Sequence, residues 1–158
     1  MTATAAATTA TPVELAHGWC ALSLLHSRIE SHIERALQGV HDLSVREYTL
    51  LDVLSNQHNG VGGHLRMNEV AEAVVLSQSA TTRLVTRLED RGLLLRYLCD
   101  TDRRGIYTDV APAGLALLAE ARPTHDAALR EALDNASADP RLAPLVAAVE
   151  TLSGSVTV

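Results

Sequence analysis

The sequence predicts a mainly α-helical fold that carries one β-hairpin. Its 158 residues are rich in Ala, Leu and Val and contain no Phe, a composition that favours helices over a sandwich of sheets. Apolar residues recur at helical spacing over most of the chain. The exceptions are LLLRYLC and GIYTDV, two strand-like runs joined by DTDRR, and this pattern predicts the hairpin.

Long helices are predicted at both ends of one continuous domain over residues 12–153. Residues 1–11 are a low-complexity Ala/Thr tail that we expect to be disordered. The N-terminal helix covers 12–42, up to a stop near Gly39, and has an apolar seam at helical spacing. The seam consists of Leu15, Trp19, Leu22, His26, Ile29, Ile33 and Ala36.

The C-terminal helices cover residues 112–153. Pro112 opens the first of them, Pro123 should kink or break it, and Pro140 should begin the last helix. Apolar seams on end helices need a partner. The simplest partner is a second copy of the chain, so we expect these helices and the helix over 12–42 to form a homodimer.

Residues 43–111 carry the signals of a winged helix-turn-helix. Ser44 with Glu47 three residues later forms a capping box before a second helix. A short helix over 67–74 and a helix capped by Ser77 and closed by Gly92 follow, with the hairpin after them. A short helix, a turn, a polar-faced helix and a hairpin are the elements of a winged helix-turn-helix, in order.

The helix after Ser77 has two faces. Ala80, Thr81, Leu84 and Leu88 gather on one side, the predicted core face. The opposite side, called here the outer stripe, carries small polar and basic side chains: Gln78, Ser79, Thr82, Arg83, Thr86 and Arg87. Small side chains let a helix enter the major groove, where Arg can pair with guanine and Gln with adenine. We therefore expect double-stranded DNA as the partner.

Charge is unevenly distributed along the chain. The whole chain carries −6, yet between Ser77 and Tyr107 arginines outnumber acidic residues by two. A locally basic segment on an acidic body is compatible with phosphate binding. A winged helix that binds another protein is the alternative, although the outer stripe lacks the aromatic and apolar anchors that protein interfaces favour.

The run LRMNEVAEAVVLSQSATTRLVTRLEDRGLL, followed by DTDRRGIYTDVAPAG, resembles the MarR family of bacterial transcription regulators over residues 43–114. The resemblance implies a homodimer on a pseudo-palindromic operator, with one helix per subunit in the major groove. It also implies that Arg104 enters the minor groove and that Asp102 holds it by a salt bridge, leaving Arg103 as a phosphate contact. A repressor released by a small-molecule effector is the implied function.

Two positions depart from the family pattern. Ala111 stands where a Thr usually caps the following helix, and losing such a cap costs about 1 kcal/mol unless another group replaces it. Val75 stands in the turn where many relatives have Gly. Because a β-branched residue resists positive φ, we expect this turn to avoid a left-handed residue.

The resemblance also implies an effector site for a small aromatic or acidic molecule. The candidate residues near the junction of dimerisation helices and DNA-binding lobe are Trp19, His26, Arg28, Tyr48 and Asp52. A plain core or interface aromatic is the competing interpretation of Trp19. A peroxide-sensing branch places a reactive cysteine near Cys20. Because no Tyr lies within residues 1–47 to support a thiolate, we expect Cys20 to be buried and inert, with redox sensing through Cys20 as the alternative. We also expect Cys99 to be buried and inert.

Other classes of protein have little support. The sequence has no Gly-rich phosphate loop, no nucleophile elbow and no histidine pair at metal-ligand spacing, so we expect no enzyme activity, no metal and no cofactor. It has neither a transmembrane run nor a signal peptide, and we expect a cytoplasmic protein that does not bind membranes.

Overall fold

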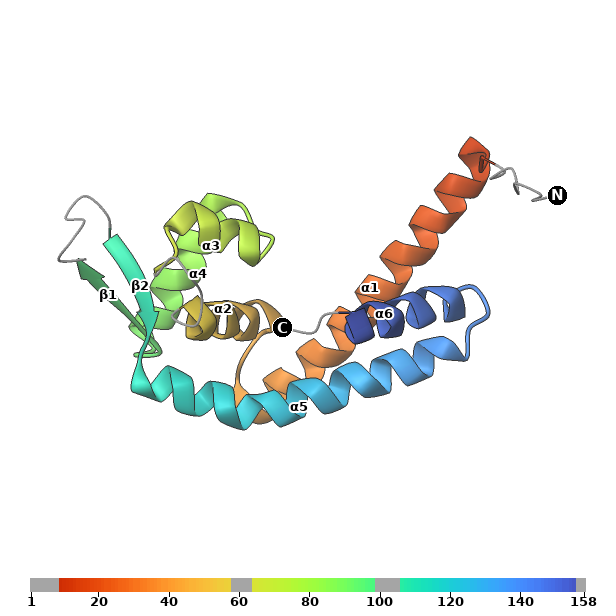
Figure 1. The fold of residues 1–158 in the computed structure, drawn as a ribbon. Coiled ribbons are helices and arrows are strands. Elements are labelled where there is room, and N and C mark those ends of the chain that lie inside the picture. The colour runs from red at the N-terminus through yellow and green to blue at the C-terminus, as the bar shows by residue number, and fades with distance from the viewer. Residues whose placement is uncertain (1–8, 58–63, 99–105, 156–158) are drawn as a thin grey trace. The chain divides into compact units, whose positions relative to one another are not determined.

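A computed structural model describes residues 9–57, 64–98 and 106–155. Over these ranges the fold is mainly helical with one antiparallel hairpin, as predicted (Figure 1). The elements in chain order are α1 Pro12–His41, α2 Val45–Asn56, α3 Met67–Ala73, α4 Gln78–Asp90, β1 Leu94–Leu98, β2 Ile106–Val110, α5 Pro112–Ser137 and α6 Ala143–Ser155.

The chain forms two compact units. The first contains residues up to His32 and from Leu129 onward, and the second contains Ile33–Ala128. The long helices α1 and α5 each contribute residues to both units. The second unit therefore holds the predicted helix-turn-helix and hairpin together with the second part of α1 and the first part of α5.

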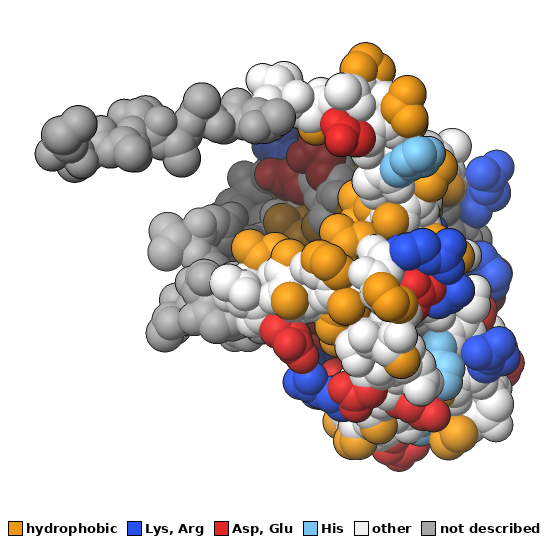
Figure 2. Space-filling model, turned by 90° about the vertical axis from the view of Figure 1, so that its right-hand side faces the viewer, with side chains coloured by type: hydrophobic (Ala, Val, Ile, Leu, Met, Phe, Trp, Pro, Cys, Tyr) orange, Lys and Arg blue, Asp and Glu red, His pale blue; other side chains and the backbone are white. Residues whose placement is uncertain are grey.

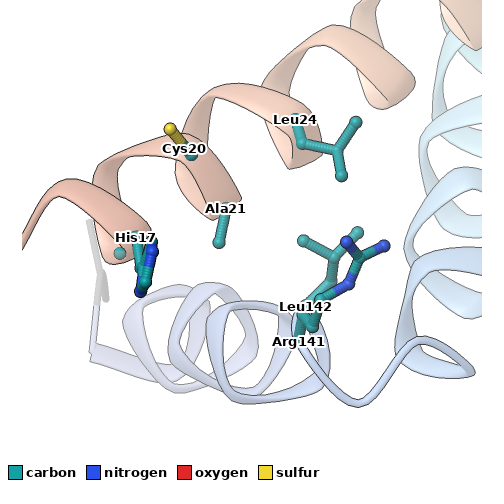
Figure 3. Close-up of a pocket in the computed structure, with 7 residues that line it drawn as sticks. His17, Cys20, Ala21, Leu24, Arg141 and Leu142 are labelled. Atoms are coloured by element: carbon teal, nitrogen blue, oxygen red, sulfur yellow. The ribbon is translucent and has the colours of Figure 1, made fainter. Parts of the chain in front are cut away.

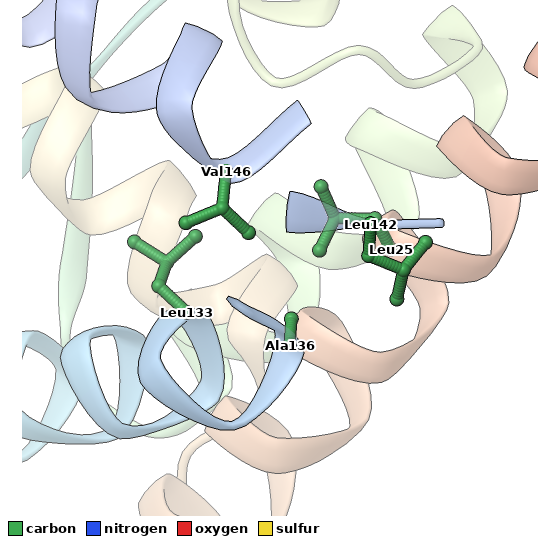
Figure 4. Packing of buried hydrophobic residues seen from close by; sticks show 5 residues of the cluster. All are labelled: Leu25, Leu133, Ala136, Leu142 and Val146. Atoms are coloured by element: carbon green, nitrogen blue, oxygen red, sulfur yellow. The ribbon is translucent and has the colours of Figure 1, made fainter. Parts of the chain in front are cut away.

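The first unit has a small aliphatic core (Figure 4). Its buried residues come from α1, α5, α6 and the turn between α5 and α6: Leu25, Leu133, Ala136, Leu142 and Val146. The predicted seam of α1 is only partly buried, since Leu15, Trp19 and Leu22 are exposed whereas Leu25 is buried. Hydrophobic side chains are also visible from outside in the space-filling view (Figure 2). The core interpretation of Trp19 is therefore wrong for this chain on its own.

The second unit has the larger core. Its largest fully buried side chains, which lie on α1, α2, α3 and α4 or just before α2, are Leu37, Leu43, Leu50, Leu51, Leu54, Val70, Thr81, Val85 and Leu88. Aliphatic residues at helical spacing let these short helices bury one face each. The hairpin packs against α2 and α4, with Leu94 and Val110 buried at the paired ends of its strands.

The predicted helix starts are confirmed. Ser44 Oγ accepts the Glu47 N–H at 3.1 Å, and Glu47 Oε2 accepts the Ser44 N–H at 2.9 Å, which completes the capping box of α2. Ser77 Oγ accepts the Ala80 N–H at 3.2 Å and caps α4. Both bonds satisfy donors that a helix leaves open in its first turn.

Helices α3 and α4 end in the same way. Leu76 N–H bonds to Ala71 O at 3.0 Å in the first, and Leu93 N–H bonds to Leu88 O at 2.9 Å in the second. This six-to-one bond defines a Schellman motif, which requires a left-handed residue at the position between. Gly92 fills it in α4 with φ of 72°, as expected, whereas Val75 fills it in α3 with φ of 55°.

The expectation that this turn avoids a left-handed residue is therefore wrong. The hydrogen bonds of the motif force Val75 into the left-handed region despite its branched Cβ. Its side chain is 82% exposed, so no packing offsets the strain.

Three expected helix boundaries also need correction. Of the kink or break expected at Pro123, the break does not occur, since α5 continues from Pro112 to Ser137. A proline removes one backbone bond, and buried residues on both sides hold the helix. Pro140 lies in a turn whose Asp139 carbonyl accepts the N–H groups of Leu142 and Ala143, so α6 begins later than predicted. Helix α1 passes Gly39 and ends at His41.

The backbone at the start of α5 passes close to the backbone of Leu93, between α4 and β1. Leu93 O accepts the Ala111 N–H at 2.9 Å. A Cβ atom added to Gly114 would lie 2.2 Å from the same carbonyl oxygen, which is far inside van der Waals contact. Gly114 is thus required by the approach of two backbones, which accounts for the glycine in the predicted pattern.

Candidate nucleic-acid interface

Helix α4 is held by one face and exposed on the other. Thr81, Leu84, Val85 and Leu88 are buried, which confirms three of the four predicted core residues and adds Val85. Ala80 is half-buried. All six residues of the outer stripe are exposed. The fold therefore presents to solvent the side chains expected to meet DNA.

The side chains of the outer stripe differ in whether they already make hydrogen bonds within the protein. Thr82 Oγ1 donates to the Gln78 backbone carbonyl at 2.9 Å, and Thr86 Oγ1 accepts from Arg96 Nη2 at 3.0 Å. Ser79 Oγ lies 3.3 Å from Ser77 Oγ. Within the described ranges, the guanidinium of Arg83 makes no hydrogen bond or ion pair, which leaves its donors available.

Glu47 is a buried carboxylate behind α4. It is 4% exposed, and besides capping α2 it lies 3.3 Å from Arg91 Nη1 and 3.7 Å from Arg87 Nε. Arg91 also donates to the Asp42 carbonyl at 2.8 Å. Arg87, predicted as a DNA contact, is thus oriented by Glu47. The capping pattern identified Glu47, but no sequence signal predicted its pairing with α4.

Arg96 is a further residue that the sequence reasoning missed. It lies on β1, and its Nη2 is 2.7 Å from Glu89 Oε2 on α4 as well as 3.0 Å from Thr86 Oγ1. It therefore links the hairpin to the exposed side of α4. Its position among the arginines between Ser77 and Tyr107 was the available signal, but strand alternation alone could not tell which helix it meets.

The hairpin is fixed at its base by Gln57, at the end of α2. This buried amide donates to Thr108 O at 3.0 Å and Asp109 Oδ1 at 3.2 Å, and its oxygen accepts the Leu65 N–H at 3.2 Å. The strand register runs from Leu94 opposite Val110 to Leu98 opposite Ile106. The predicted wing residues Asp102, Arg103 and Arg104, with Cys99, lie outside the described residues.

Two of the candidate effector residues lie together in the second unit. Tyr48 is buried and stacks on His125, with ring centroids 4.3 Å apart, and Asp52 lies 2.8 Å from Arg122 Nη2. Burial, followed by the negative charge of Asp52, raises the pKa of Tyr48 above its ordinary value. Arg122 and His125 were not predicted, because α5 had to be placed before they could be located.

The other three candidates belong to the first unit. Trp19 is 68% exposed, His26 lies 3.9 Å from Glu30, and Arg28 lies 3.4 Å from Asp139. Asp139 is also paired with Arg141, whose side-chain and backbone hydrogen bonds lower the pKa of this carboxyl to about 2. No hydrogen bond or ion pair joins Trp19, His26 and Arg28 to one another within the described chain.

A cavity of about 530 Å³ opens in the first unit between α1 and the turn that precedes α6 (Figure 3). Its lining residues are His17, Gly18, Cys20, Ala21, Leu24, Arg141 and Leu142. Cys20 is exposed in the single chain, so the expectation of a buried thiol is wrong. It lies on the α1 segment before Leu25, where every residue up to this cysteine is exposed because the core of the unit begins later.

A membrane-spanning helix and a metal-binding cluster are both absent from the described residues. None of the helices in these ranges is both long and apolar enough to span a membrane. No cluster of three or more His, Cys, Asp or Glu side chains in the same ranges could hold a metal ion.

Known proteins that resemble this chain include transcription regulators of the MarR family. A sequence model described as the MarR family matches residues 41–105. The HTH-type transcriptional regulator MhqR of Bacillus subtilis is 26% identical over 110 residues, which cover 70% of this chain and 72% of that protein. AbsC, described as a MarR family transcriptional regulator from Streptomyces coelicolor, is 25% identical with a TM-score of 0.69, over 95% of this chain and 98% of that one. CouR from Rhodococcus jostii RHA1, solved bound to p-coumaroyl-CoA, is 32% identical with a TM-score of 0.59, over 68% and 71% of the two chains.

Proposed function

Because this chain belongs to the MarR family of transcription regulators, we propose that it is a homodimer that binds a pseudo-palindromic DNA operator, represses transcription, and is released by a small-molecule effector. We place it in the cytoplasm and assign it no enzyme activity and no cofactor. Half-sites about one helical turn apart suit a two-fold symmetric protein of this kind.

The observation that carries the proposal is the outer stripe of α4. Its six exposed side chains are hydroxyls, an amide and guanidiniums, and the opposite face of the same helix is buried. These groups can donate to and accept from base edges, and none is a large apolar anchor. We assign base contacts to Gln78, Ser79, Thr82, Arg83 and Thr86, and phosphate contacts to Arg87 and Arg103. Arg104, braced by Asp102, is assigned to the minor groove.

Exposed apolar residues support the dimer. In the first unit, large hydrophobic side chains on α1 and α6 are exposed to solvent in the single chain: Val13, Leu15, Trp19, Leu22, Val149 and Leu152. Exposed apolar patches of this kind mark interaction surfaces. A second copy that covers α1 and α6 would bury them.

An effector of aromatic or acidic character is proposed from two observations. CouR was solved with p-coumaroyl-CoA, a ligand with an aromatic acyl group. In this chain the second unit places Tyr48, Asp52, Arg122 and His125 near one another, which combines aromatic surface with hydrogen-bonding and charged groups. From the sequence, Trp19, His26 and Arg28 of the first unit remain candidate effector residues.

Selection of bound duplexes from a pool of genomic fragments tests the function. We expect the purified protein to enrich a two-fold symmetric motif, and its affinity for that motif to fall by orders of magnitude between about 50 and 200 mM salt, since phosphate contacts release counterions. No enrichment, together with affinity that salt does not change, would favour the protein-binding alternative. The same titration with added aromatic acids tests effector release.

A further inference from the structure

We propose that Thr82 and Thr86 read bases with opposite hydrogen-bond polarity, and that Arg96 sets the polarity of Thr86 without touching a base. This inference rests on the proposed function, because it assumes that α4 lies in the major groove. It assigns a specificity role to Arg96, a residue of the hairpin rather than of the outer stripe.

Thr82 is limited to accepting. A threonine hydroxyl has one hydrogen and two lone pairs. Thr82 Oγ1 gives its hydrogen to the Gln78 carbonyl at 2.9 Å, so only lone pairs remain for a base. In the major groove, acceptors are met by the exocyclic amines of adenine and cytosine, whereas guanine and thymine present acceptors there. Thr82 therefore fits adenine or cytosine.

Thr86 has the opposite arrangement. Arg96 Nη2 lies 3.0 Å from Thr86 Oγ1, and a guanidinium can only donate, so the hydroxyl oxygen is the acceptor in this bond. Within the described ranges the Thr86 hydrogen has no acceptor, so it is available to a base. A hydroxyl hydrogen suits N7 or O6 of guanine, N7 of adenine and O4 of thymine, whereas the amine of cytosine can meet only the one lone pair of Thr86 that Arg96 leaves.

Arg96 is itself held in place. Its Nη2 is 2.7 Å from Glu89 Oε2, and both Glu89 and Thr86 belong to α4. The positive charge directed at Thr86 Oγ1 also opposes the approach of an amine to that oxygen. Arg96 is therefore a positioning residue, and its influence reaches the DNA through Thr86.

The two threonines address separate base pairs. They are four residues apart, which is about 6 Å along a helix axis. Successive bases of one strand are about 3.4 Å apart. Thr82 and Thr86 therefore fall on separate base pairs, because about 6 Å spans nearly two base steps of about 3.4 Å. A change at one should leave the preference at the other intact.

The test combines protein variants with single-atom changes in the DNA. The wild-type motif is first obtained by selection from random duplexes, and Thr82→Val and Thr86→Val identify the base pair that each hydroxyl contacts. At the Thr82 base, removing the amine (purine for adenine, or 2-pyrimidinone for cytosine) should weaken wild-type binding roughly three- to tenfold, the range of one hydrogen bond. The same analogue should not weaken Thr82→Val further, and Thr82→Ser should behave as wild type.

At the Thr86 base, deletion of an acceptor should have the corresponding effect. Suitable analogues are 7-deaza purines, 2-aminopurine for guanine and 5-methyl-2-pyrimidinone for thymine. Arg96→Ala should admit cytosine at this position, because the positive charge that opposes the approach of an amine to Thr86 Oγ1 is then gone. Arg96→Lys should keep the wild-type preference, since an ammonium also only donates.

Three results would overturn the inference. The first is binding that is sensitive to deletion of an acceptor, and not of the amine, on the base that Thr82 contacts. The second is rejection of cytosine by Arg96→Ala as strong as in wild type, and the third is a relaxed base preference at the Thr82 position in Arg96→Ala. A wild-type protein that selects no motif would instead overturn the proposed function. Both Arg96→Ala and Arg96→Lys should unfold cooperatively on heating and should still bind random DNA at low salt, Arg96→Ala more weakly because it lacks one positive charge. These two measurements separate a change in base preference from a loss of fold.

Discussion

Glu47 of α2 and Arg91, which caps the C-terminus of α4, form an ion pair with Oε2 and Nη1 3.3 Å apart, in which the carboxylate is 4% exposed. The same carboxylate caps α2 through Ser44 N–H. One side chain therefore satisfies a helix start and holds the last turn of the helix that carries the outer stripe. The orientation of α4 therefore depends on the buried Glu47 carboxylate, whose charge is balanced by an arginine and not by water.

Glu47→Ala should lower the free energy of unfolding by about 2 kcal/mol, because it leaves Arg91 without its buried partner and opens the cap of α2. The side chain of Arg91 is 30% exposed, which keeps the loss below that of a fully buried pair. Urea unfolding followed by circular dichroism measures it. Glu72→Ala, at an exposed position of α3, is the matched control and should change stability by less than about 0.5 kcal/mol.

Val75→Gly should stabilise the protein by about 1 kcal/mol. A residue with a Cβ atom is destabilised by about 1–2 kcal/mol in the left-handed region. Glycine removes this strain, but its greater conformational freedom in the unfolded chain cancels part of the stabilisation. Gly92→Ala, in the matching position after α4, should have the opposite sign. A Val75→Gly protein that unfolds at lower urea than wild type would contradict the assignment of strain to φ of 55°.

Gly114→Ala should destabilise the second unit by about 2 kcal/mol or more, because the new methyl group would lie 2.2 Å from Leu93 O and one backbone must move. Thermal unfolding gives the comparison. A Cβ on Gly39, in the last turns of α1, would meet nothing within 4 Å, so Gly39→Ala should be neutral or stabilising. Equal effects at both positions would mean that the close approach is absent in solution.

Asp139 should remain ionised to about pH 2. Its folded pKa lies below the ordinary value of 3.8, so the stabilisation from its pairing with Arg141 is fully present above about pH 4 and is lost as the pH falls towards 2. Carbon-13 NMR of the side-chain carboxyl reports the midpoint directly. In Arg141→Gln the midpoint should rise towards the ordinary value, and an unchanged midpoint would refute the proposed cause.

Arg83→Ala and Arg104→Ala should separate sequence preference from overall affinity for the operator. Arg83, whose guanidinium is unengaged within the described ranges, should change which operator sequences are preferred. Arg104→Ala should weaken operator binding sharply while leaving the dimer intact by analytical ultracentrifugation. Equal loss on all DNA for Arg83→Ala would assign that residue to phosphate, and full affinity of Arg104→Ala would remove the wing assignment.

Local signals in the sequence predicted the fold well. Ser44, Ser77, Gly92 and the hairpin each have a cause within a few residues, and all four lie where expected. The prediction at Val75 was wrong because the hydrogen bonds of the turn outweigh the preference of the residue for negative φ.

The site was predictable only in part, for a related reason. The amphipathic pattern of α4 gives its exposed residues, since period and polarity are local properties. The pairing of Glu47 with Arg91, of Arg96 with Thr86 and of Asp52 with Arg122 joins residues that tertiary packing alone brings together. No pattern along a single sequence contains these contacts.

Val75 also bears on how this protein can change over generations. Every valine codon becomes a glycine codon by a single base change, so the relaxed turn is one mutational step from the present sequence. A chain that carries such an unused gain can accept a destabilising substitution elsewhere and recover afterwards. A single mutation in the turn before α4 can therefore offset a destabilising substitution in the helix that follows it.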